Sequence, residues 1–392
     1  MRLNNKKKIL FINGHMNVGG IEKSLLDLLN HINYEKYDIS LLLLEDLGDY
    51  VPLINKNIKI LFYDTSNVYG PLITTLLKNF KKGNFKNILY RIIILCSRFI
   101  NPKCYKILNF LLPINKYYDV AIAYRPDECA NILAYCINSQ KKLLWWHLGD
   151  CTLSKKQINK TTIVWKKIDM IITVSKACQQ MLKIKFSTLS ERIVILPNMI
   201  NEEELEYASG EVSPFKDKSN LNFVTVSRLF IEKHVENIVD IVIYLIKENI
   251  TQFKWYIIGD GDLFESIQQK IHTHKLEKWI IMMGRKKNPY PYIKYADILI
   301  HTSYIEAQCT TMLESMALKT PCVITKTKNP QDFTIDNYNC LIAEQEISSL
   351  SQNLINLINN PALRENLITN AKKTVKDYSP QKTIKNFELL LN

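Results

Sequence analysis

The sequence lacks the long apolar runs of an integral membrane protein. No stretch of its 392 residues approaches the roughly 20 consecutive apolar residues that a membrane-spanning helix needs. The apolar run at residues 9–12 follows three lysines, as in a signal peptide, but it is far too short for one. This run is typical instead of a first buried β-strand. We therefore expect a soluble or peripheral protein.

Paired cysteines and metal-ligand clusters are also missing. The nine cysteines are scattered, odd in number and without a C-x-x-C pair. Disulfide frameworks and zinc cages need closer spacing, so we predict reduced thiols, most of them core fillers. No group of His, Cys and carboxylate residues has the spacing of a metal site, and we predict that the protein needs no metal.

A complete glycine fingerprint for dinucleotides is absent as well. Gly259-x-Gly261 lacks the third glycine, because Phe264 occupies its place. Asp260-Gly261-Asp262 spells a D-x-D triplet, a pattern that also occurs in metal sites, but here it directly follows a predicted strand. We interpret it as a turn in which an aspartate caps the next helix.

Acidic residues are missing from residues 65–118. Phe, Leu and Tyr residues stand between the basic residues of this segment at helical spacing, which suits helices lying on anionic lipid headgroups. The alternatives are a solvated face on helices that pack against their own sheet, and a nucleic-acid patch. No nucleic-acid-binding signature is present, so we predict no nucleic-acid partner. The basic residues are Lys78, Lys81, Lys82, Lys86, Arg91, Arg98, Lys103, Lys106 and Lys116.

The charge of the whole chain has the same asymmetry. The formal net charge is +13. Residues 1–200 carry 29 Lys and Arg against 14 Asp and Glu, whereas residues 201–392 carry 22 against 24. The first half therefore carries all the excess positive charge, which indicates that it faces a polyanion. We expect that polyanion to be an anionic membrane surface, reached through the basic segment at residues 78–116.

Short apolar runs alternate with helix-period segments along the whole chain. The composition, 47% hydrophobic and 23% charged, is that of a globular protein, and 392 residues suit two domains of roughly 200 each. The helices between the strands include one predicted at residues 87–111. The predicted strands are 8–13, 38–45, 58–63, 120–124, 142–147, 170–174 and 193–196 in the first half, and 222–227, 255–258, 280–283, 298–301, 322–325 and 340–342 in the second.

This alternation predicts an α/β fold of two Rossmann-like, doubly wound domains that face each other across a cleft. Residues 1–200 form the first domain, and residues 201–376 form the second. The second domain opens with a polar stretch at residues 201–220, which we interpret as the interdomain connection. Residues 377–392 form a last helix, which we expect to pack back toward the first domain.

Two cations mark the first strand-to-helix turn of the second domain. Arg228 and Lys233 stand five positions apart, after the strand at residues 222–227. Cations beside helix-terminal amides form a natural diphosphate site. Charge-assisted hydrogen bonds of about 1.5–3 kcal/mol each would stabilise the charge on a departing nucleoside diphosphate. Taken singly, such residues are usually surface cations with solvated heads.

Two glutamates eight positions apart form a second pattern. Glu306 lies in the loop after the strand at residues 298–301, and Glu314 lies about one turn inside the helix that Thr310 and Thr311 open. Amides at a helix start favour phosphate or sugar oxygens, and a carboxylate one turn inside can accept hydrogen bonds from ribose hydroxyls. Alone, the two glutamates could equally be capping and surface charges.

Together these motifs resemble glycosyltransferase family 4. The resemblance rests on VSRLFIEKH at residues 226–234, IIGDGD at residues 257–262, the run at residues 284–325 and the loop GGIEKSL at residues 19–25. It covers nearly the whole chain, in the family's order, and the R-x4-K and E-x7-E elements are much more specific together than singly. It implies the two-Rossmann-domain fold called GT-B and a retaining, nucleotide-sugar-dependent transferase that needs no metal or other cofactor.

By this resemblance, the second domain binds the sugar-nucleotide donor. Arg228 and Lys233 would hold the diphosphate, Glu314 would hold the ribose, and Glu306 would lie near the transferred sugar. The other implied donor-side residues are Gly284, Arg285 and Lys286 near the base, Ala307, Thr310 and Thr311 near the sugar and phosphates, and Gly19 and Gly20, which face the diphosphate from the first domain.

The triplet Trp145-Trp146-His147 resembles the family's W-x-H. The resemblance places His147 on the acceptor side of the cleft, and we predict that it acts in catalysis together with Arg228, Lys233 and Glu306. The alternative is a loop histidine whose hydrogen bonds are satisfied within the fold.

The chain departs from the family pattern in two places. His234 stands where the family usually has glycine, and Ala307-Gln308-Cys309 replaces the usual Gly-aromatic-Pro. Gln308 and Cys309 alter the loop that the resemblance places at the sugar. The identity of the donor sugar therefore stays open.

The sequence as a whole predicts a retaining glycosyltransferase of bacterial surface-polysaccharide synthesis. A UDP-hexose or UDP-N-acetylhexosamine is the favoured donor, and the acceptor is a lipid-linked saccharide or another glycan. We expect the protein in the cytoplasm, attached peripherally to the inner face of the cell membrane. The alternatives are a nucleotide-sugar epimerase of the same fold and a non-catalytic protein that binds anionic lipid or nucleic acid. Retention follows from the resemblance alone, since no second carboxylate is visible to act as a nucleophile.

Overall fold

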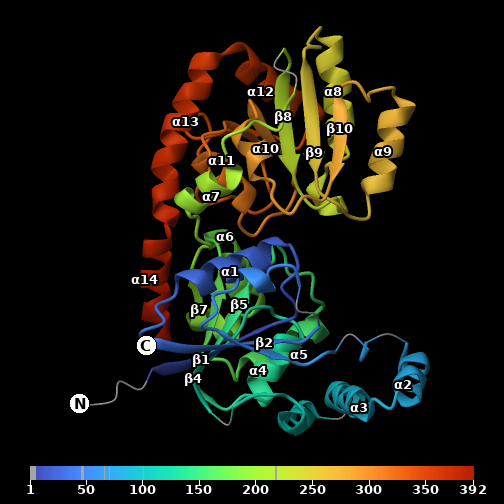
Figure 1. Ribbon diagram of the computed structural model, residues 1–392, viewed down its shortest axis with the longest axis vertical. Coiled ribbons are helices and arrows are strands. Elements are labelled where there is room, and N and C mark those ends of the chain that lie inside the picture. The colour runs from blue at the N-terminus through green and yellow to red at the C-terminus, as the bar shows by residue number, and fades with distance from the viewer. Residues whose placement is uncertain are drawn as a thin grey trace. The chain divides into compact units, whose positions relative to one another are not determined.

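The computed structural model describes residues 6–45, 48–65, 67–69, 71–99, 101–115, 117–216 and 219–392, apart from the side chains of Arg98 and Phe99. Lys116 of the predicted basic segment lies outside these residues. The chain divides into two compact units (Figure 1): unit 1 comprises residues 1–197 and 384–392, and unit 2 comprises residues 198–383. The first boundary therefore follows Pro197, three residues before the predicted one.

Unit 1 is built on a parallel sheet of seven strands in the order β3-β2-β1-β4-β5-β6-β7. Residues 9–12 of β1, an interior strand of this sheet, form a continuous apolar run that is fully buried, as expected for a parallel strand that is covered on both faces. The strands are β1 (Lys7–Asn13), β2 (Tyr37–Leu43), β3 (Lys59–Phe62), β4 (Tyr118–Ala123), β5 (Ser139–Trp146), β6 (Met170–Thr173) and β7 (Ile193–Ile195). The helices are α1 (Gly20–His31), α2 (Leu72–Lys81), α3 (Phe85–Phe99), α4 (Glu128–Tyr135), α5 (Lys155–Trp165) and α6 (Lys176–Lys185), with 3-10 segments η1 (Val51–Leu53), η2 (Pro102–Phe110) and η3 (Ser187–Arg192).

Unit 2 is built on a parallel sheet of six strands in the order β10-β9-β8-β11-β12-β13. The strands are β8 (Leu221–Val226), β9 (Phe253–Ile258), β10 (Ile280–Gly284), β11 (Ile298–His301), β12 (Cys322–Thr325) and β13 (Leu341–Ala343). The helices are α7 (Glu202–Ser209), α8 (Asn237–Lys247), α9 (Phe264–Thr273), α10 (Tyr290–Lys294), α11 (Thr310–Ala317), α12 (Ile347–Asn359) and α13 (Pro361–Val375), with 3-10 segments η4 (Ile231–Lys233) and η5 (Lys376–Tyr378). The last helix, α14 (Pro380–Leu391), begins in unit 2 and continues into unit 1. Two Rossmann-like parallel α/β units confirm the predicted fold class.

Two elements differ from the sequence predictions. The predicted helix at residues 87–111 is split: α3 ends at Phe99, and η2 begins at Pro102, whose ring disfavours an α-conformation at the residue before it. The stretch at residues 201–220, predicted as the connection, contains helix α7. Leu205 of α7 is buried in the core of unit 2, so this part of the chain is packed into that unit and is more than a connection.

The last helix, α14, carries an aromatic side chain into the core of unit 1. The ring centroid of Phe387 lies 6.2 Å from that of Phe11 and 6.0 Å from that of Trp145. Lys7 Nζ donates a hydrogen bond to the carbonyl oxygen of Leu391 at 2.6 Å. Burying a Phe side chain contributes about 1.5–3 kcal/mol to stability, so the end of the chain is an integral part of unit 1.

The turn after β9 depends on a glycine. Gly259 has a φ of +155°, and a Cβ at this position would overlap the carbonyl oxygen of Ser227 and lie 2.9 Å from its carbonyl carbon. Asp260 Oδ1 accepts a hydrogen bond from the N–H of Gly261 at 2.8 Å, which fits the predicted turn. The prediction that an aspartate caps the next helix is wrong. Leu263 is the N-cap of α9, no side chain caps the helix, and a backbone carbonyl accepts the Leu263 N–H.

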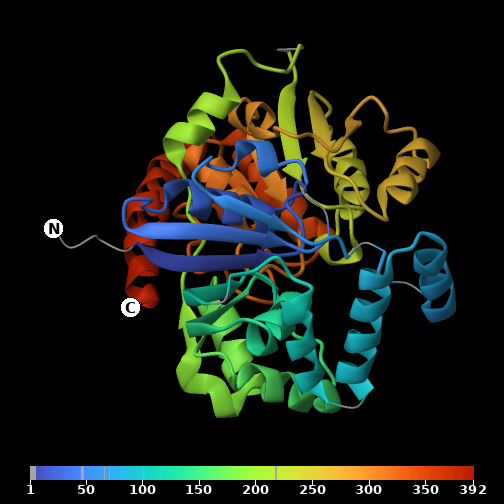
Figure 2. The same ribbon diagram turned by 60° about the horizontal axis from the view of Figure 1, so that its bottom comes forward.

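Helix α2 has an inverted distribution of polar and apolar side chains. Thr75 and Asn79 are buried, whereas Ile73, Leu77 and Phe80 are 72%, 54% and 65% exposed. Figure 2 shows α2 and α3 in light blue as neighbouring helices of unit 1. Within the described ranges, no helix is both long enough and apolar enough to cross a bilayer.

Candidate functional site

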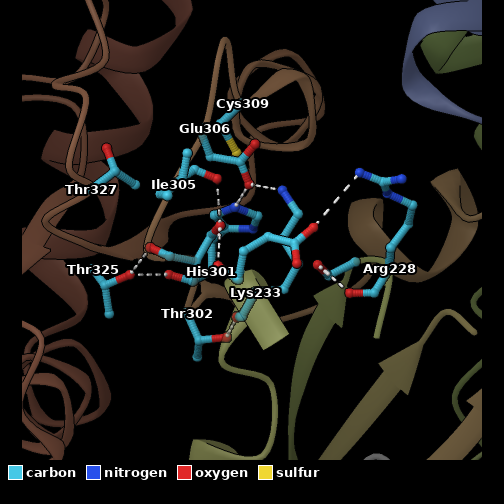
Figure 3. A network of polar contacts seen from close by, with 12 residues as sticks. Arg228, Lys233, His301, Thr302, Ile305, Glu306, Cys309, Thr325 and Thr327 are labelled. Carbon is cyan, nitrogen blue, oxygen red and sulfur yellow. Dashed lines mark hydrogen bonds and ion pairs between the residues drawn. The ribbon is translucent and has the colours of Figure 1, made fainter. Parts of the chain in front are cut away.

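Side chains from three segments of unit 2 meet at one carboxylate oxygen (Figure 3). Lys233 Nζ lies 2.6 Å from Glu306 Oε1, and His301 Nε2 lies 2.7 Å from the same oxygen. Lys233 ends η4, His301 ends β11, and Glu306 lies in the loop between β11 and α11. Their side chains are 12%, 4% and 11% exposed, respectively. Two predicted catalytic residues, Lys233 and Glu306, are therefore in direct contact.

The charges in this contact stabilise one another. Burial raises the pKa of Glu306, but the hydrogen bond from His301 and the charge of Lys233 outweigh burial and hold the pKa below its ordinary value. Burial lowers the pKa of His301, but Cys309 and Glu306 outweigh burial and raise the pKa above its ordinary value. The site therefore holds an ionised carboxylate between two basic side chains.

Hydrogen bonds tie η4 to the loop between β11 and α11. Thr302 Oγ1 donates to the carbonyl oxygen of Lys233, 69 positions away, at 2.8 Å. The backbone N–H of Tyr304 donates to the carbonyl oxygen of Glu232 at 2.9 Å, and Ser303 Oγ donates to the same oxygen at 3.3 Å. Because backbone atoms of both segments are held, the geometry of the site is set before any ligand arrives.

His234 follows η4 in a left-handed conformation, with φ +47° and ψ +33°. This conformation costs a residue with a Cβ about 1–2 kcal/mol, which is the physical reason for glycine at this position in the family pattern. The His234 ring stacks on Tyr304, with centroids 5.6 Å apart and planes 15° apart. The stack offsets part of the strain and adds a further contact between η4 and the loop before α11.

Arg228 lies at the same strand-to-helix turn, but its head is open to solvent. The side chain is 68% exposed, and one guanidinium nitrogen lies 4.0 Å from Glu232 Oε1. The guanidinium also lies over the Phe230 ring, 5.3 Å from its centroid. An exposed ion pair of this length contributes little, so most of the guanidinium donors remain available to an incoming anion. The structure thus pairs Lys233 with Glu306 and leaves Arg228 outside that pair.

The loop into α11 is anchored at the two residues that depart from the family pattern, by the side chain of Gln308 and by the backbone of Cys309. Gln308 Oε1 accepts the backbone N–H of Asn198 at 2.8 Å. The backbone N–H of Cys309 donates to Gln331 Oε1 at 2.8 Å. Both Gln308 and Cys309 are buried. These residues therefore support the loop from inside unit 2, in contrast to the half-buried Glu314 of α11.

The other predicted donor-side residues of unit 2 follow the ends of parallel strands, where α/β sheets bind their ligands. Arg285 is exposed, and Lys286 is half-buried. Their roles toward a donor stay predictions. Thr310, Thr311 and Glu314 lie on α11, Ala307 lies in the loop before it, and Gly284, Arg285 and Lys286 lie at and after the end of β10.

The predicted glycine turn of unit 1 opens helix α1. Gly19 is the N-cap and Gly20 is the first helical residue. The Glu22 carboxylate folds over this turn, because a Cβ on Gly19 would overlap Glu22 Oε2. Glu22 is 5% exposed, and its Oε1 accepts no hydrogen bond. A carboxylate therefore covers the turn that the resemblance assigns to a diphosphate, and that assignment stays a prediction.

His147 follows β5 among aromatic side chains. Its ring centroid lies 4.6 Å from that of Tyr124 and 5.8 Å from that of Trp145, and its Nε2 is buried without a hydrogen-bond partner. Burial, together with the charge of Arg125, lowers the pKa of His147 to about 3. The imidazole is therefore neutral near pH 7. Its catalytic role stays a prediction.

The depressed pKa of His147 makes the stability of the fold depend on pH. The unfolded chain binds this proton below about pH 6.5, whereas the folded protein binds it only near pH 3, so stability is lost as the pH falls. From pH 7 to pH 5 we expect His147 to remove about 2 kcal/mol from the free energy of unfolding. Urea unfolding of the wild type and of His147→Gln at both pH values measures this difference. Equal pH dependence in the two proteins would contradict it.

Sequence reasoning missed His301. The only signal in the sequence was its place at the end of a predicted strand, five residues before Glu306. A histidine in a short apolar strand is first interpreted as a core residue. One ring nitrogen of His301, a carboxylate oxygen of Glu306 and the thiol of Cys309 lie within 4.8 Å of one another. The search for short ligand spacing missed this trio because its members come from a strand, a loop and a helix start.

Comparisons with known proteins agree with this architecture. Residues 211–374 match the family model described as "Glycosyl transferases group 1". An uncharacterized glycosyltransferase of Methanocaldococcus jannaschii is 22% identical over 343 residues, which are 74% of this chain and 83% of that protein.

Two further proteins carry informative names. The N-acetylgalactosamine-N,N'-diacetylbacillosaminyl-diphospho-undecaprenol 4-alpha-N-acetylgalactosaminyltransferase of Campylobacter jejuni is 26% identical over 223 residues, which are 56% of this chain and 59% of that protein. The crystal structure of Anabaena HepE in complex with UDP-glucose superposes with a TM-score of 0.73 at 16% identity, covering 98% of this chain and 99% of HepE. This second likeness concerns the fold alone.

Proposed function

We propose that this chain, a glycosyltransferase of the GT-B type by its family match and its fold, moves a hexose or N-acetylhexosamine from a UDP-sugar to a lipid-linked saccharide or other glycan, with retention of configuration. The observation that carries the proposal is the buried contact of Lys233 and Glu306 beside the open head of Arg228. The UDP-glucose bound by HepE supports the choice of nucleotide, and the diphospho-undecaprenol in the name of the Campylobacter protein supports a lipid-linked acceptor.

Lys233 and Arg228 would stabilise the leaving diphosphate. An ammonium has three donors, and Glu306 uses one of those on Lys233, so the others can meet phosphate oxygens. Arg228 can offer paired donors from its exposed head. Both cations would act most strongly on the charge that grows as the sugar leaves, which lowers the barrier.

Glu306 would act mainly by positioning. Its Oε1 already receives hydrogen bonds from Lys233 and His301, and its pKa is lowered, so this carboxylate is a weak nucleophile. We therefore assign Glu306 to orienting Lys233 beside the transferred sugar, and not to a covalent sugar intermediate. Glu314 and the first residues of α11 would hold the ribose and phosphate oxygens.

The assignment of Arg228 can be tested by removing its head. Arg228→Ala is expected to lower kcat/KM for transfer by about tenfold to a hundredfold, because one charge-assisted contact of about 1.5–3 kcal/mol is lost. The fold should be unaffected, since the side chain is exposed. Lys278→Ala is the matched control, because Lys278 is also a cation over an aromatic ring, 5.1 Å from the centroid of Trp279. Equal, near-normal turnover in both variants would refute the assignment.

The donor and the reaction class can be tested together. Thermal unfolding with UDP-, GDP- and other nucleotide sugars should show stabilisation of about 2.7 kcal/mol by the true donor at 100 times its Kd. That donor is then incubated with and without a lipid-linked saccharide, and the products are separated. Sugar transfer only in the presence of acceptor supports the proposal. Conversion of the donor alone to a stereoisomer would identify an epimerase instead.

We further propose that α2 and α3 attach the protein to the cytoplasmic face of an anionic membrane. Apolar side chains on α2 recur at helical spacing on its exposed face, while polar ones are buried, which is unfavourable in water. Four exposed lysines flank these apolar residues, so the surface combines insertion with charge attraction to lipid headgroups. The exposed apolar residues of α2, α3 and η2 are Leu72, Ile73, Leu77, Phe80, Phe85, Leu89, Ile92, Ile107 and Phe110, and the four lysines are Lys78, Lys81, Lys82 and Lys86.

Vesicle binding tests this attachment. The wild type should sediment with vesicles of phosphatidylglycerol and phosphatidylcholine but not with phosphatidylcholine alone. The double variant Lys81→Gln/Lys82→Gln should bind about 30-fold more weakly, because each lysine near the surface contributes about 1 kcal/mol. Lys247→Gln/Lys275→Gln, which changes two exposed lysines of unit 2, is the matched control. Equal binding by both double variants would contradict the assignment to α2 and α3.

A further inference from the structure

The side chains around Glu306 also form a set of metal ligands. A ring nitrogen of His301, a carboxylate oxygen of Glu306 and the Cys309 thiol lie within 4.8 Å of one another; His301 and Cys309 are buried, and the Glu306 side chain is 11% exposed. Figure 3 shows the Cys309 sulfur next to the Glu306 carboxylate. Imidazole, carboxylate and thiolate are the three ligand types that proteins use for zinc.

A second observation concerns the other ring nitrogen of His301. His301 Nδ1 is buried and has no hydrogen-bond partner. Buried polar atoms almost always have a partner, and an unsatisfied one costs about 1–3 kcal/mol. Nε2 is the ring nitrogen that faces Glu306, at 2.7 Å, so a metal ion shared with Glu306 binds Nε2 in place of its proton, while Nδ1 keeps the N–H of the neutral ring.

From this arrangement we propose that His301, Glu306 and Cys309 bind one Zn²⁺ ion, and that the bound ion inhibits sugar transfer reversibly. Tetrahedral coordination at about 2.0–2.3 Å requires ligand atoms about 3.5 Å apart, so His301 Nε2 and Glu306 Oε1, now 2.7 Å apart, separate by just under about 1 Å as the ion enters between them. The Cys309 thiol releases its proton to solvent when it coordinates the ion. The metal binding stands without the proposed function, whereas the inhibition rests on it.

Inhibition follows from competition for Glu306. In the structure this carboxylate holds the Lys233 ammonium. A divalent ion on Glu306 takes over that carboxylate and repels Lys233, which leaves its position at the donor phosphates. The family pattern has proline at the position of Cys309, and proline offers no thiolate. We therefore expect this chain to be more sensitive to zinc than proteins that follow the family pattern.

Cobalt spectroscopy tests the metal binding without any substrate. Chelator-treated full-length protein is titrated with Co²⁺ and then with Zn²⁺. One equivalent of Co²⁺ should give the visible bands of a tetrahedral ion and the near-ultraviolet band of a thiolate ligand, and Zn²⁺ should abolish both. Cys309→Ser should lose the thiolate band and bind Zn²⁺ at least tenfold more weakly, while Cys340→Ser, at another buried cysteine of unit 2, should behave as the wild type. Circular dichroism checks that both variants fold.

The inhibition is measured separately, for each protein relative to its own rate without metal. Wild-type transfer should fall with added Zn²⁺ and recover with chelator, and Cys309→Ser should need at least tenfold more Zn²⁺ for the same effect. No thiolate band in the wild type, or a band that persists in Cys309→Ser, overturns the site. Binding without inhibition, or stimulation by Zn²⁺, overturns the inhibitory role. Metal binding by a protein that transfers no sugar would leave the site standing and refute the proposed function.

Discussion

Replacing Lys233 with Met is expected to lower kcat/KM for sugar transfer by about 10²–10³-fold, the usual loss for one preorganised donor to a developing negative charge. Methionine keeps the length of the side chain without its charge. The loss should fall mainly on kcat, because the ammonium meets the most negative charge as the diphosphate leaves.

The same substitution should also destabilise the fold. It leaves the Glu306 carboxylate with His301 as its only remaining partner among the contacts described. Removing one partner of a buried ion pair costs about 3–5 kcal/mol, and the hydrogen bond from His301 reduces this cost. The double variant Lys233→Met/Glu306→Gln removes both charges and should regain most of the stability, but not the activity. Urea unfolding and initial rates of the three proteins separate the two effects.

The two readouts can also fail separately. If the double variant regains turnover together with stability, Lys233 serves the fold and not the reaction. If Lys233→Met keeps near-normal turnover, the assignment of this residue to the diphosphate is wrong. A loss of activity at unchanged stability would show that the buried ion pair contributes little to folding.

Placing a methyl group on Gly259 is expected to remove more than about 4 kcal/mol from the free energy of unfolding. The Cβ of Gly259→Ala would occupy the position of the Ser227 carbonyl oxygen, and both atoms belong to backbone that cannot move without breaking the turn. The N–H of Ser227 is bonded to the carbonyl of Ile258, so the shift would pull apart β8 and β9 where they end. Changes this large are rare among single substitutions.

The control for this substitution is Gly20→Ala. A Cβ on Gly20 meets no atom within 4 Å, and Gly20 is the first residue of α1, where alanine is tolerated. Its stability in urea should equal that of the wild type or exceed it slightly. A Gly259→Ala protein that is soluble and as stable as the control would show that the turn rearranges freely.

Local pattern predicted the fold because both sheets are parallel and buried. When helices cover both faces of a parallel sheet, a short apolar run such as those in β1 and β8 is best interpreted as a buried strand. The observed strands lie close to their predicted positions. Predictions from local pattern were wrong where a single residue determines the structure of a segment. Pro102 separates α3 from η2 within the segment that was predicted as one helix. The acidic segment that was predicted as a linker contains helix α7, which packs through Leu205.

The site was predicted in part, for a different reason. The R-x4-K and E-x7-E motifs identified Lys233 and Glu306 as candidate site residues. In the structure their side chains are in contact, although they stand 73 positions apart in the sequence. His301 could not be found this way, because only the fold aligns the end of β11 with the loop beyond it. The position of the Glu22 carboxylate over Gly19 could not be predicted either, since it depends on side-chain direction. The exposed head of Arg228 agrees with the alternative prediction of a solvated surface cation.

The assignment of residues 384–392 to unit 1 has a consequence for dissecting the protein. The chain leaves unit 1 after Pro197 and re-enters it at Ile384, so neither unit can be expressed whole by a single truncation. A fragment ending at Pro197 would lack Phe387 and expose the surface around Phe11 and Trp145 to water. Proteolytic cleavage near the start of unit 2 would cut the backbone without separating the two fragments, because residues 384–392 of the second fragment would still pack into unit 1.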